Sequence, residues 1–138
     1  MADSGENDPC SVIAPSVRVI AAVAGTFYGT TMTAGHIYQV AGDGRAGSTG
    51  DGGRATAASL EVAGCAVVDG AGNLVIGDGP RVRVIAARSG RFYGRALTAG
   101  DVYTIAGSGG FDAFSGDGGP AVKAGMLPMG VGTDRPEI

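Results

Sequence analysis

The stretch VRVIAAVAGTFYGTTMTAGHIYQVAG, residues 17–42, occurs a second time as VRVIAARSGRFYGRALTAGDVYTIAG, residues 82–107. The two copies align without gaps at an offset of 65 residues, and 16 of the 26 aligned positions are identical. Differences such as Ile37 against Val102, Met32 against Leu97 and Val40 against Ile105 keep apolar character. An internal repeat of this kind predicts a stack of similar structural units.

A second repeated segment lies downstream of each copy. GDGGRATAASLEVAGCAVVD begins at Gly50 and matches GDGGPAVKAGMLPMGVGTD, which begins at Gly116, after a shift of one residue. The repeat period is therefore about 65 residues. Each of these segments is expected to hold one short helical turn, within residues 55–60 and 121–127.

Each period predicts four β-strands, which in the middle of the chain are residues 64–69, 73–78, 81–87 and 101–107. GCAVVD and NLVIGD flank the short glycine turn GAG, which is typical of a hairpin. RVRVIAA alternates arginine with apolar residues, and DVYTIAG is rich in β-branched and aromatic residues. Antiparallel strands follow from this pattern, with two long loops in each period, which in the first copy are residues 21–36, between the third and fourth strands, and residues 43–64.

The ends of the chain supply the remaining strands. Residues 10–14 stand where the second strand of the first copy is expected, and residues 129–134 repeat a first strand. The sequence therefore predicts an all-β fold of two four-stranded antiparallel sheets, arranged as β-propeller blades with one blade split between the termini. Residues 1–9 and 135–138 are predicted to be flexible tails around the two blades at 10–134.

Composition supports this fold and narrows the function. The 27 glycines among 138 residues favour short strands and turns over long helices, and the net charge of −3 does not indicate a polyanion partner. Without a signal-peptide pattern or an apolar run of about 18 residues, the chain as it stands is expected to be cytoplasmic and not in a membrane. Longer relatives with a signal of their own would be secreted. Cys10 and Cys65 lack the spacing of a metal or redox pair, so separate buried thiols are favoured over a mutual disulfide.

Taken together, these motifs resemble the NHL-repeat β-propellers, especially the glycine-rich bacterial kind. The resemblance covers about residues 11–134 and rests on the order GDGG, VVD, GNLVIGD, RVRV and VYTIAG. It implies a propeller fold. Complete members of the family carry about six blades, whereas this chain holds two, which implies either a fragment or a ring built from several chains.

Two blades alone leave an apolar strand face uncovered at each end. Head-to-tail contacts between identical chains close into a ring when the rotation per chain divides a full turn. Three chains of 13.5 kDa would supply about six blades, so a cyclic homotrimer of about 40 kDa is expected. The first expected partner of the chain is therefore itself.

The two GDGG loops carry Asp51 and Asp117, which are weak candidates for calcium ligands. An Asx-type turn, in which the carboxylate accepts backbone N–H groups, is favoured over metal binding, because each loop offers too few oxygen ligands. Gly52 and Gly118 beside them are expected to take positive φ. No cofactor is expected.

Aromatic and basic residues supply the candidate binding positions. Each repeat holds a Phe-Tyr pair in the connection between its third and fourth strands, where packing of the loop is favoured over a binding platform. The second repeat holds a run of five arginines, of which alternation places Arg81 and Arg83 on one strand face and the other three in the loop beyond its end. A solvated or interface-lining face is favoured, with polyanion binding as the alternative. The candidates are Phe27, Tyr28, Phe92, Tyr93, Arg81, Arg83, Arg88, Arg91 and Arg95.

Catalysis is not favoured by the residues present. His36 is the single histidine, and no nucleophile-elbow, zinc-protease or P-loop motif occurs. Some NHL-type propellers are metal-dependent enzymes that hold their ion with several histidines. We therefore expect a non-catalytic scaffold that presents loops to a protein or glycan partner. The alternatives are an enzyme with a metal site shared at the ring centre, and a propeller that binds RNA or another polyanion.

Overall fold

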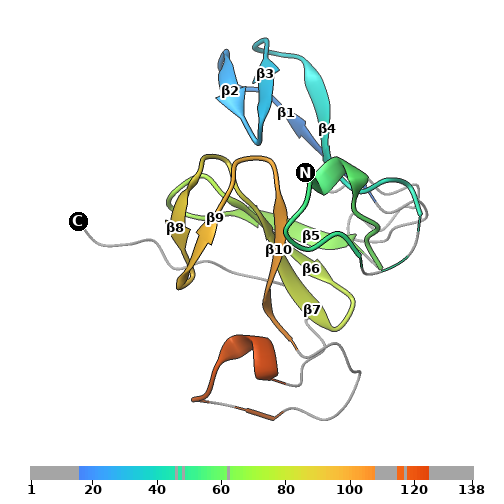
Figure 1. Cartoon of the computed structure of the whole chain (residues 1–138). Coiled ribbons are helices and arrows are strands. Elements are labelled where there is room, and N and C mark those ends of the chain that lie inside the picture. The colour runs from blue at the N-terminus through green and yellow to red at the C-terminus, as the bar shows by residue number, and fades with distance from the viewer. Residues whose placement is uncertain are drawn as a thin grey trace.

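The structure is a computed structural model that describes residues 16–45, 47, 49–61, 63–107, 115–116 and 118–124, with only the backbone of 63–65. The fold is all-β and consists of small antiparallel sheets, as predicted (Figure 1). Within the described residues the helices are two 3₁₀ turns, η1 (Ala55–Ala57) and η2 (Ala121–Lys123), which confirms the expected helical turn in each repeat. No helix in this part of the chain is long and apolar enough to cross a membrane.

The largest sheet has four antiparallel strands and comes from the middle of the chain. Its strands are β5 (Ala63–Val68), β6 (Leu74–Asp78), β7 (Arg81–Ile85) and β10 (Val102–Ala106). They lie in the order β10-β7-β6-β5, so β5, β6 and β7 are neighbours in the order of the chain, and β10 follows β7 after a hairpin at residues 90–97. The four strands predicted for the middle repeat are therefore confirmed, and they form a meander.

The turn between β5 and β6 is organised by one carboxylate. Asp69 Oδ1 accepts the backbone N–H groups of Ala71 and Asn73, each at 2.9 Å. Asn73, which is fully buried, accepts the N–H of Ala87 through its side-chain oxygen at 3.1 Å. This Asx-type turn thereby ties the end of the hairpin to the chain that leaves β7.

The first repeat is described as a smaller sheet. Strand β1 (Val17–Ile20) pairs antiparallel with β4 (Ile37–Ala41). The two further strands predicted for this sheet, residues 10–14 and 129–134, lie outside the described residues, as do the predicted tails. The second four-stranded sheet and the blade split between the termini therefore stay predictions.

The long connections predicted between the third and fourth strands are in fact hairpins. One is formed by β2 (Gly25–Phe27) and β3 (Thr30–Met32), the other by β8 (Gly90–Phe92) and β9 (Arg95–Leu97). Their tips are Tyr-Gly pairs with positive φ at both residues, 53° and 72° in the first hairpin and 54° and 76° in the second. Positive φ at both central positions is the geometry of a type I′ hairpin turn. The prediction of a loop was wrong because this turn places tyrosine where asparagine or aspartate is usual.

The period of 65 residues is also a structural period. Gly42 N–H donates to the carbonyl of Ala55, and Gly107 N–H donates to that of Ala121, both at 2.9 Å. Tyrosines at equivalent places, Tyr38 and Tyr103, each accept a backbone N–H at their hydroxyl, at 2.8 and 2.9 Å. Equivalent residues therefore form equivalent local structure in the two repeats.

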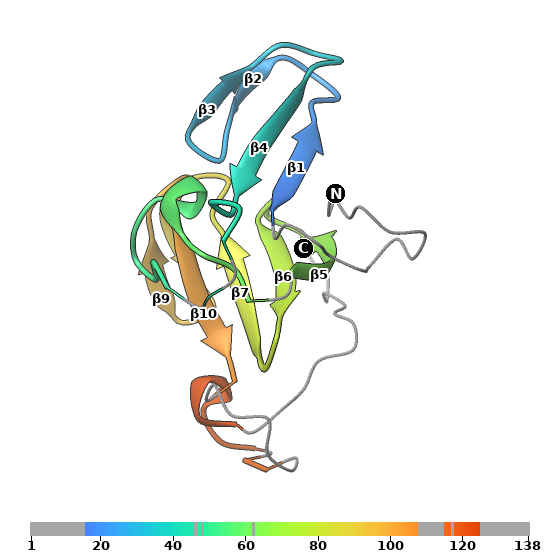
Figure 2. The same cartoon turned by 90° about the vertical axis from the view of Figure 1, so that its right-hand side faces the viewer.

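The largest apolar cluster lies between the repeats. In both views η1 lies between the β1–β4 sheet and the four-stranded sheet (Figures 1 and 2). Just before η1, Gly52 N–H donates to Val102 O at 2.7 Å and Gly53 O accepts Val102 N–H at 3.0 Å, so the chain lines the free edge of β10. The fully buried members of the cluster are Val17, Ala41, Ala55, Ala58, Leu60, Ile76, Ile85 and Val102.

Positive φ is confirmed at Gly52 and Gly118, at 82° and 83°. The loop that contains Gly52 also contains Gly50, with φ of 89°. A Cβ at Gly50 would lie 2.5 Å from the Cβ of Ala58, whereas a Cβ at Gly52 would meet nothing within 4 Å. Backbone strain is thus common to both glycines, and a steric clash belongs to Gly50 alone.

We expect Gly52→Ala to lower the free energy of unfolding by about 1–2 kcal/mol through positive φ alone. Gly50→Ala should lower the free energy of unfolding by about 1–3 kcal/mol more than Gly52→Ala does, because the added Cβ collides with Ala58 in the packed interface. Urea denaturation followed by circular dichroism measures both. Equal losses in the two variants would contradict the close approach of Gly50 to Ala58.

Candidate functional site

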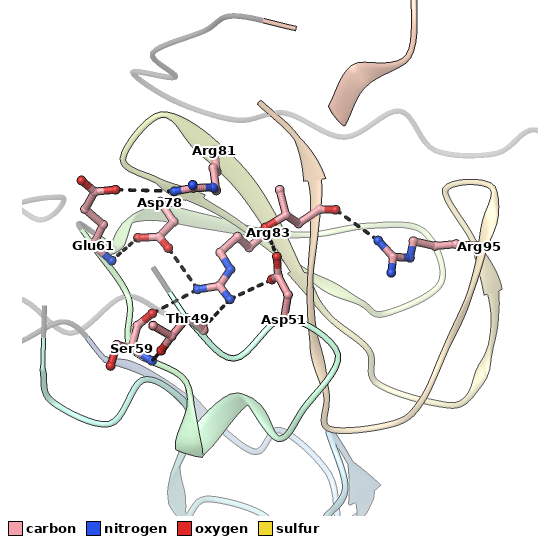
Figure 3. Close-up of polar contacts among 9 residues, drawn as sticks. Thr49, Asp51, Ser59, Glu61, Asp78, Arg81, Arg83 and Arg95 are labelled. Carbon is pink, nitrogen blue, oxygen red and sulfur yellow. Dashed lines mark hydrogen bonds and ion pairs between the residues drawn. The ribbon is translucent and has the colours of Figure 1, made fainter. Parts of the chain in front are cut away.

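A buried arginine links the two repeats. Arg83 on β7 is 1% exposed, and Figure 3 shows its guanidinium between two acidic side chains. Its Nη1 donates to Asp78 Oδ2 at 3.3 Å, and its Nη2 donates to Asp51 Oδ1 at 2.8 Å. The carbonyl oxygens of Ser59 and Thr49 accept further hydrogen bonds at 3.2 and 2.8 Å.

The partners of Arg83 come from both repeats, because Asp78 ends β6 and Asp51 lies in the GDGG loop of the first repeat. Asp78 is fully buried and also accepts the N–H of Glu61 at 2.7 Å. A buried charge is tolerated when it is paired and its remaining hydrogen bonds are satisfied. We call this group, Arg83 with Asp51 and Asp78, the arginine clamp.

The clamp corrects the prediction of an Asx-type turn at Asp51. Asp51 does not form the expected Asx-type turn, because its carboxylate oxygens accept from Arg83 and from the Thr104 hydroxyl, the latter at 2.7 Å. With both oxygens engaged, Asp51 is also a poor calcium ligand, and among the described residues no group of three or more metal-ligating side chains gathers. Asp117 lies outside the described residues.

The arginines of the second repeat differ in their surroundings, and Arg83 lines the interface between the repeats, which is one of the two positions that the sequence left open. Arg83 is buried, and the half-buried Arg81 lies 3.8 Å from a Glu61 carboxylate oxygen. The other three are exposed on or beside the β8–β9 hairpin, where Arg95 lies 5.0 Å from the centre of the Tyr103 ring. They are Arg88, Arg91 and Arg95. Alternation along β7 correctly indicated a shared side for Arg81 and Arg83, but it did not indicate that the first repeat covers that side.

The Phe-Tyr pairs pack the hairpins instead of standing free. A Cβ on Gly25 would lie 2.8 Å from the Phe27 ring, and one on Gly90 would lie 3.0 Å from the Phe92 ring, so each ring lies over its own hairpin. The phenol of each tyrosine reaches the β5–β6 turn. Tyr28 donates to Gly72 O at 2.8 Å, and Tyr93 donates to Asp69 Oδ2 at 2.6 Å.

These hydrogen bonds change the ionisation of both tyrosines and of Asp69. Burial, and then the nearby Asp69 charge, raises the pKa of Tyr28. Burial and the hydrogen bond to Asp69 raise the pKa of Tyr93 further. Burial opposes ionisation of Asp69, yet its hydrogen bonds with Tyr93, Asn73 and Ala71 outweigh burial and lower its pKa. Two hairpins are thus fixed on one negatively charged turn.

A cavity of about 230 Å³ opens at this junction, between the end of β1, the β2–β3 hairpin and the β5–β6 turn. Its lining is mostly apolar, and Arg88 supplies a positive charge beside it. Val23 and Val68 line it and are 60% and 57% exposed. Concave apolar surfaces with a few polar groups are the usual form of a ligand site. No sequence pattern indicates this cavity, because its walls come from both repeats.

Comparisons with protein-family models, curated proteins and solved structures find no match to this chain. The site is therefore interpreted from its own geometry. Of the two cysteines, Cys10 lies outside the described residues and the side chain of Cys65 is not described, so their predicted state stays untested.

We expect Arg83→Ala to lower the free energy of unfolding by about 3–5 kcal/mol, because it removes a buried guanidinium that pairs with the buried Asp78 carboxylate. Asp51→Asn should cost less, about 1–2 kcal/mol, because Asp51 is half exposed and Asp78 still pairs with the arginine. Arg91→Ala, on the exposed hairpin, is the control and should change stability by under about 0.5 kcal/mol. Chemical denaturation of the three variants checks this order, which an equal cost for Arg83→Ala and Arg91→Ala would contradict.

The raised tyrosine pKa values predict a loss of stability in alkali. Tyr93 keeps its proton in the folded state above the ordinary tyrosine pKa of about 10, whereas the unfolded chain releases it there. The contribution is fully present below about pH 10 and is lost as the pH rises toward the folded-state pKa. Titration followed at about 295 nm should show that Tyr28 and Tyr93 ionise above the ordinary tyrosine pKa, and Tyr93→Phe should remove part of this late signal. A late signal that Tyr93→Phe leaves unchanged would contradict the hydrogen bond between Tyr93 and Asp69.

Proposed function

We propose that the chain is a non-catalytic scaffold of the propeller type, which presents its β2–β3 and β8–β9 hairpins to a protein or glycan partner. In this proposal the repeats are blades of the NHL-like kind, and several chains assemble into a ring, with a cyclic homotrimer favoured. The four-stranded meander and the repeated motifs of the sequence support the blades.

The observation that carries the binding role is the apolar cavity at the junction of the repeats. The β2–β3 hairpin is held against the β5–β6 turn by Tyr28, and the cavity lies between them. Its exposed valines, Val23 and Val68, form an apolar opening beside the cationic Arg88. Such a site suits an apolar group that carries a neighbouring acceptor or negative charge, as a peptide or a substituted glycan offers.

The test compares binding by the unchanged chain, Val68→Glu and Ala96→Glu. Val68 lines the cavity, and Ala96 is an exposed residue of β9 that does not. Probes are a glycan array and a displayed peptide library. Binders of the unchanged chain should keep their affinity for Ala96→Glu and lose at least about tenfold for Val68→Glu, roughly 1.4 kcal/mol.

Three outcomes would overturn this function. If neither the glycan array nor the peptide library yields a binder, the proposed binding role is wrong. If Val68→Glu and Ala96→Glu bind a ligand equally well, that ligand does not bind in the cavity. Stoichiometric calcium or zinc in the purified protein would favour an enzyme with a shared metal site. Retention on heparin alone, weakening steeply with salt, would favour polyanion binding through Arg88, Arg91 and Arg95.

A further inference from the structure

Two equivalent pairs of apolar residues differ completely in burial. Ile85 and Val102 face each other across β7 and β10, and both are 0% exposed. Ile20 and Ile37 stand at the same places of the first repeat and face each other across β1 and β4. They are 54% and 48% exposed. The same position in the sheet is therefore covered in one repeat and open in the other.

The cover over Ile85 and Val102 comes from the first repeat. They belong to one buried cluster with Ala55, Ala58 and Leu60, all 0% exposed, from η1 and the residues that follow it. The backbone just before η1 also forms two hydrogen bonds with Val102. Residues 50–60, which we call the covering segment, thus seal the face of the next repeat.

The second repeat carries its own copy of the covering segment, centred on η2. Gly107 N–H donates a hydrogen bond to the Ala121 carbonyl at 2.9 Å, as Gly42 N–H does to the Ala55 carbonyl in the first repeat. Yet Ala121 is exposed and Ala124 is half-buried, whereas their counterparts Ala55 and Ala58 are buried completely. The described part of this second covering segment forms the same local hydrogen bonds as the first, but among the described residues no sheet face covers Ala121.

The open face and the second covering segment lie at opposite ends of the molecule. In both views the β1–β4 sheet lies on one side of the four-stranded sheet and η2 lies on the other (Figures 1 and 2). One molecule therefore does not bring them together. Two copies placed head to tail do, and they repeat the contact that already joins the two repeats within the chain.

We propose that the face of Ile20 and Ile37 binds the covering segment of a second copy of this chain, as Ile85 and Val102 bind η1. This inference names a partner of the proposed scaffold and rests on its repeat architecture, but not on its protein or glycan ligand. We choose a second copy as the partner because the equivalent face of the second repeat, at Ile85 and Val102, is already covered by a segment of this same chain. Successive head-to-tail contacts build the proposed ring.

The first experiment measures mass by light scattering over a concentration series. The unchanged chain should exceed the 13.5 kDa of one copy and grow heavier with concentration. Ile37→Glu should stay at the mass of one copy, because it places a charge in the contact. Its circular dichroism and unfolding curve should stay unchanged, since Ile37 is half exposed. Ala96→Glu, which adds the same charge on exposed β9, should associate like the unchanged chain.

The second experiment tests the head-to-tail direction. Ala121→Glu places a charge in the covering segment, so it should also stay at one copy when alone. Ala121→Glu keeps an intact face at Ile20 and Ile37, and Ile37→Glu keeps an intact covering segment, so the two variants can form one contact when they are mixed. The mixture should therefore reach two copies, about 27 kDa, and stop there.

A single-copy mass for the unchanged chain, or unchanged association of Ile37→Glu, would overturn the proposal. A mixture that stays at one copy would overturn it as well. Ile20 also lines the cavity of the proposed ligand site. The masses are measured without glycan or peptide, so failure of the ligand site and failure of this contact are separate results.

Discussion

The position of the first repeat against the second depends on how the buried Arg83 guanidinium is neutralised. A charge removed from water must be paired and hydrogen-bonded. The two Nη groups of Arg83 meet this demand with carboxylates and carbonyls from both repeats, although its buried Nε has no hydrogen-bond partner among the described residues. Asp78 is on the adjacent strand, but Asp51 belongs to the GDGG loop of the other repeat. That loop is therefore fixed over β7, and the apolar residues that follow it pack where the loop places them.

The remaining features follow from this placement. Once the GDGG loop lies along β10, η1 is held between the two sheets and the β1–β4 sheet is positioned by the same segment. The β2–β3 hairpin then reaches the β5–β6 turn, where the Tyr28 hydroxyl donates to Gly72. The cavity beside that hydrogen bond has walls from both repeats. Its shape therefore depends on how the repeats are positioned, and the arginine clamp fixes that position.

Strands were predictable from the sequence, and contacts between repeats were not. The strands β5, β6, β7 and β10 follow from alternation and β-branched residues, which are local signals. The hairpins were missed because tyrosine occupies the positive-φ position at 28 and 93. Asp51 was interpreted through its neighbours, whereas its partner Arg83 is 32 residues away. The one available signal was that each repeat keeps an aspartate and an arginine at these positions.

The difference between Ile20 and Ile85 shows why repeats of this kind favour assembly. The stability of a repeat protein is approximately the sum of its repeats and the interfaces between neighbours. Two repeats in a line share one interface, whereas repeats in a closed ring have one interface each. About half of the surface of Ile20 and of Ile37 is still in water, and covering it contributes about 1 kcal/mol per side chain. Because the same segment already seals the second repeat, no new kind of contact is needed. Repetition of a single interface then determines the architecture.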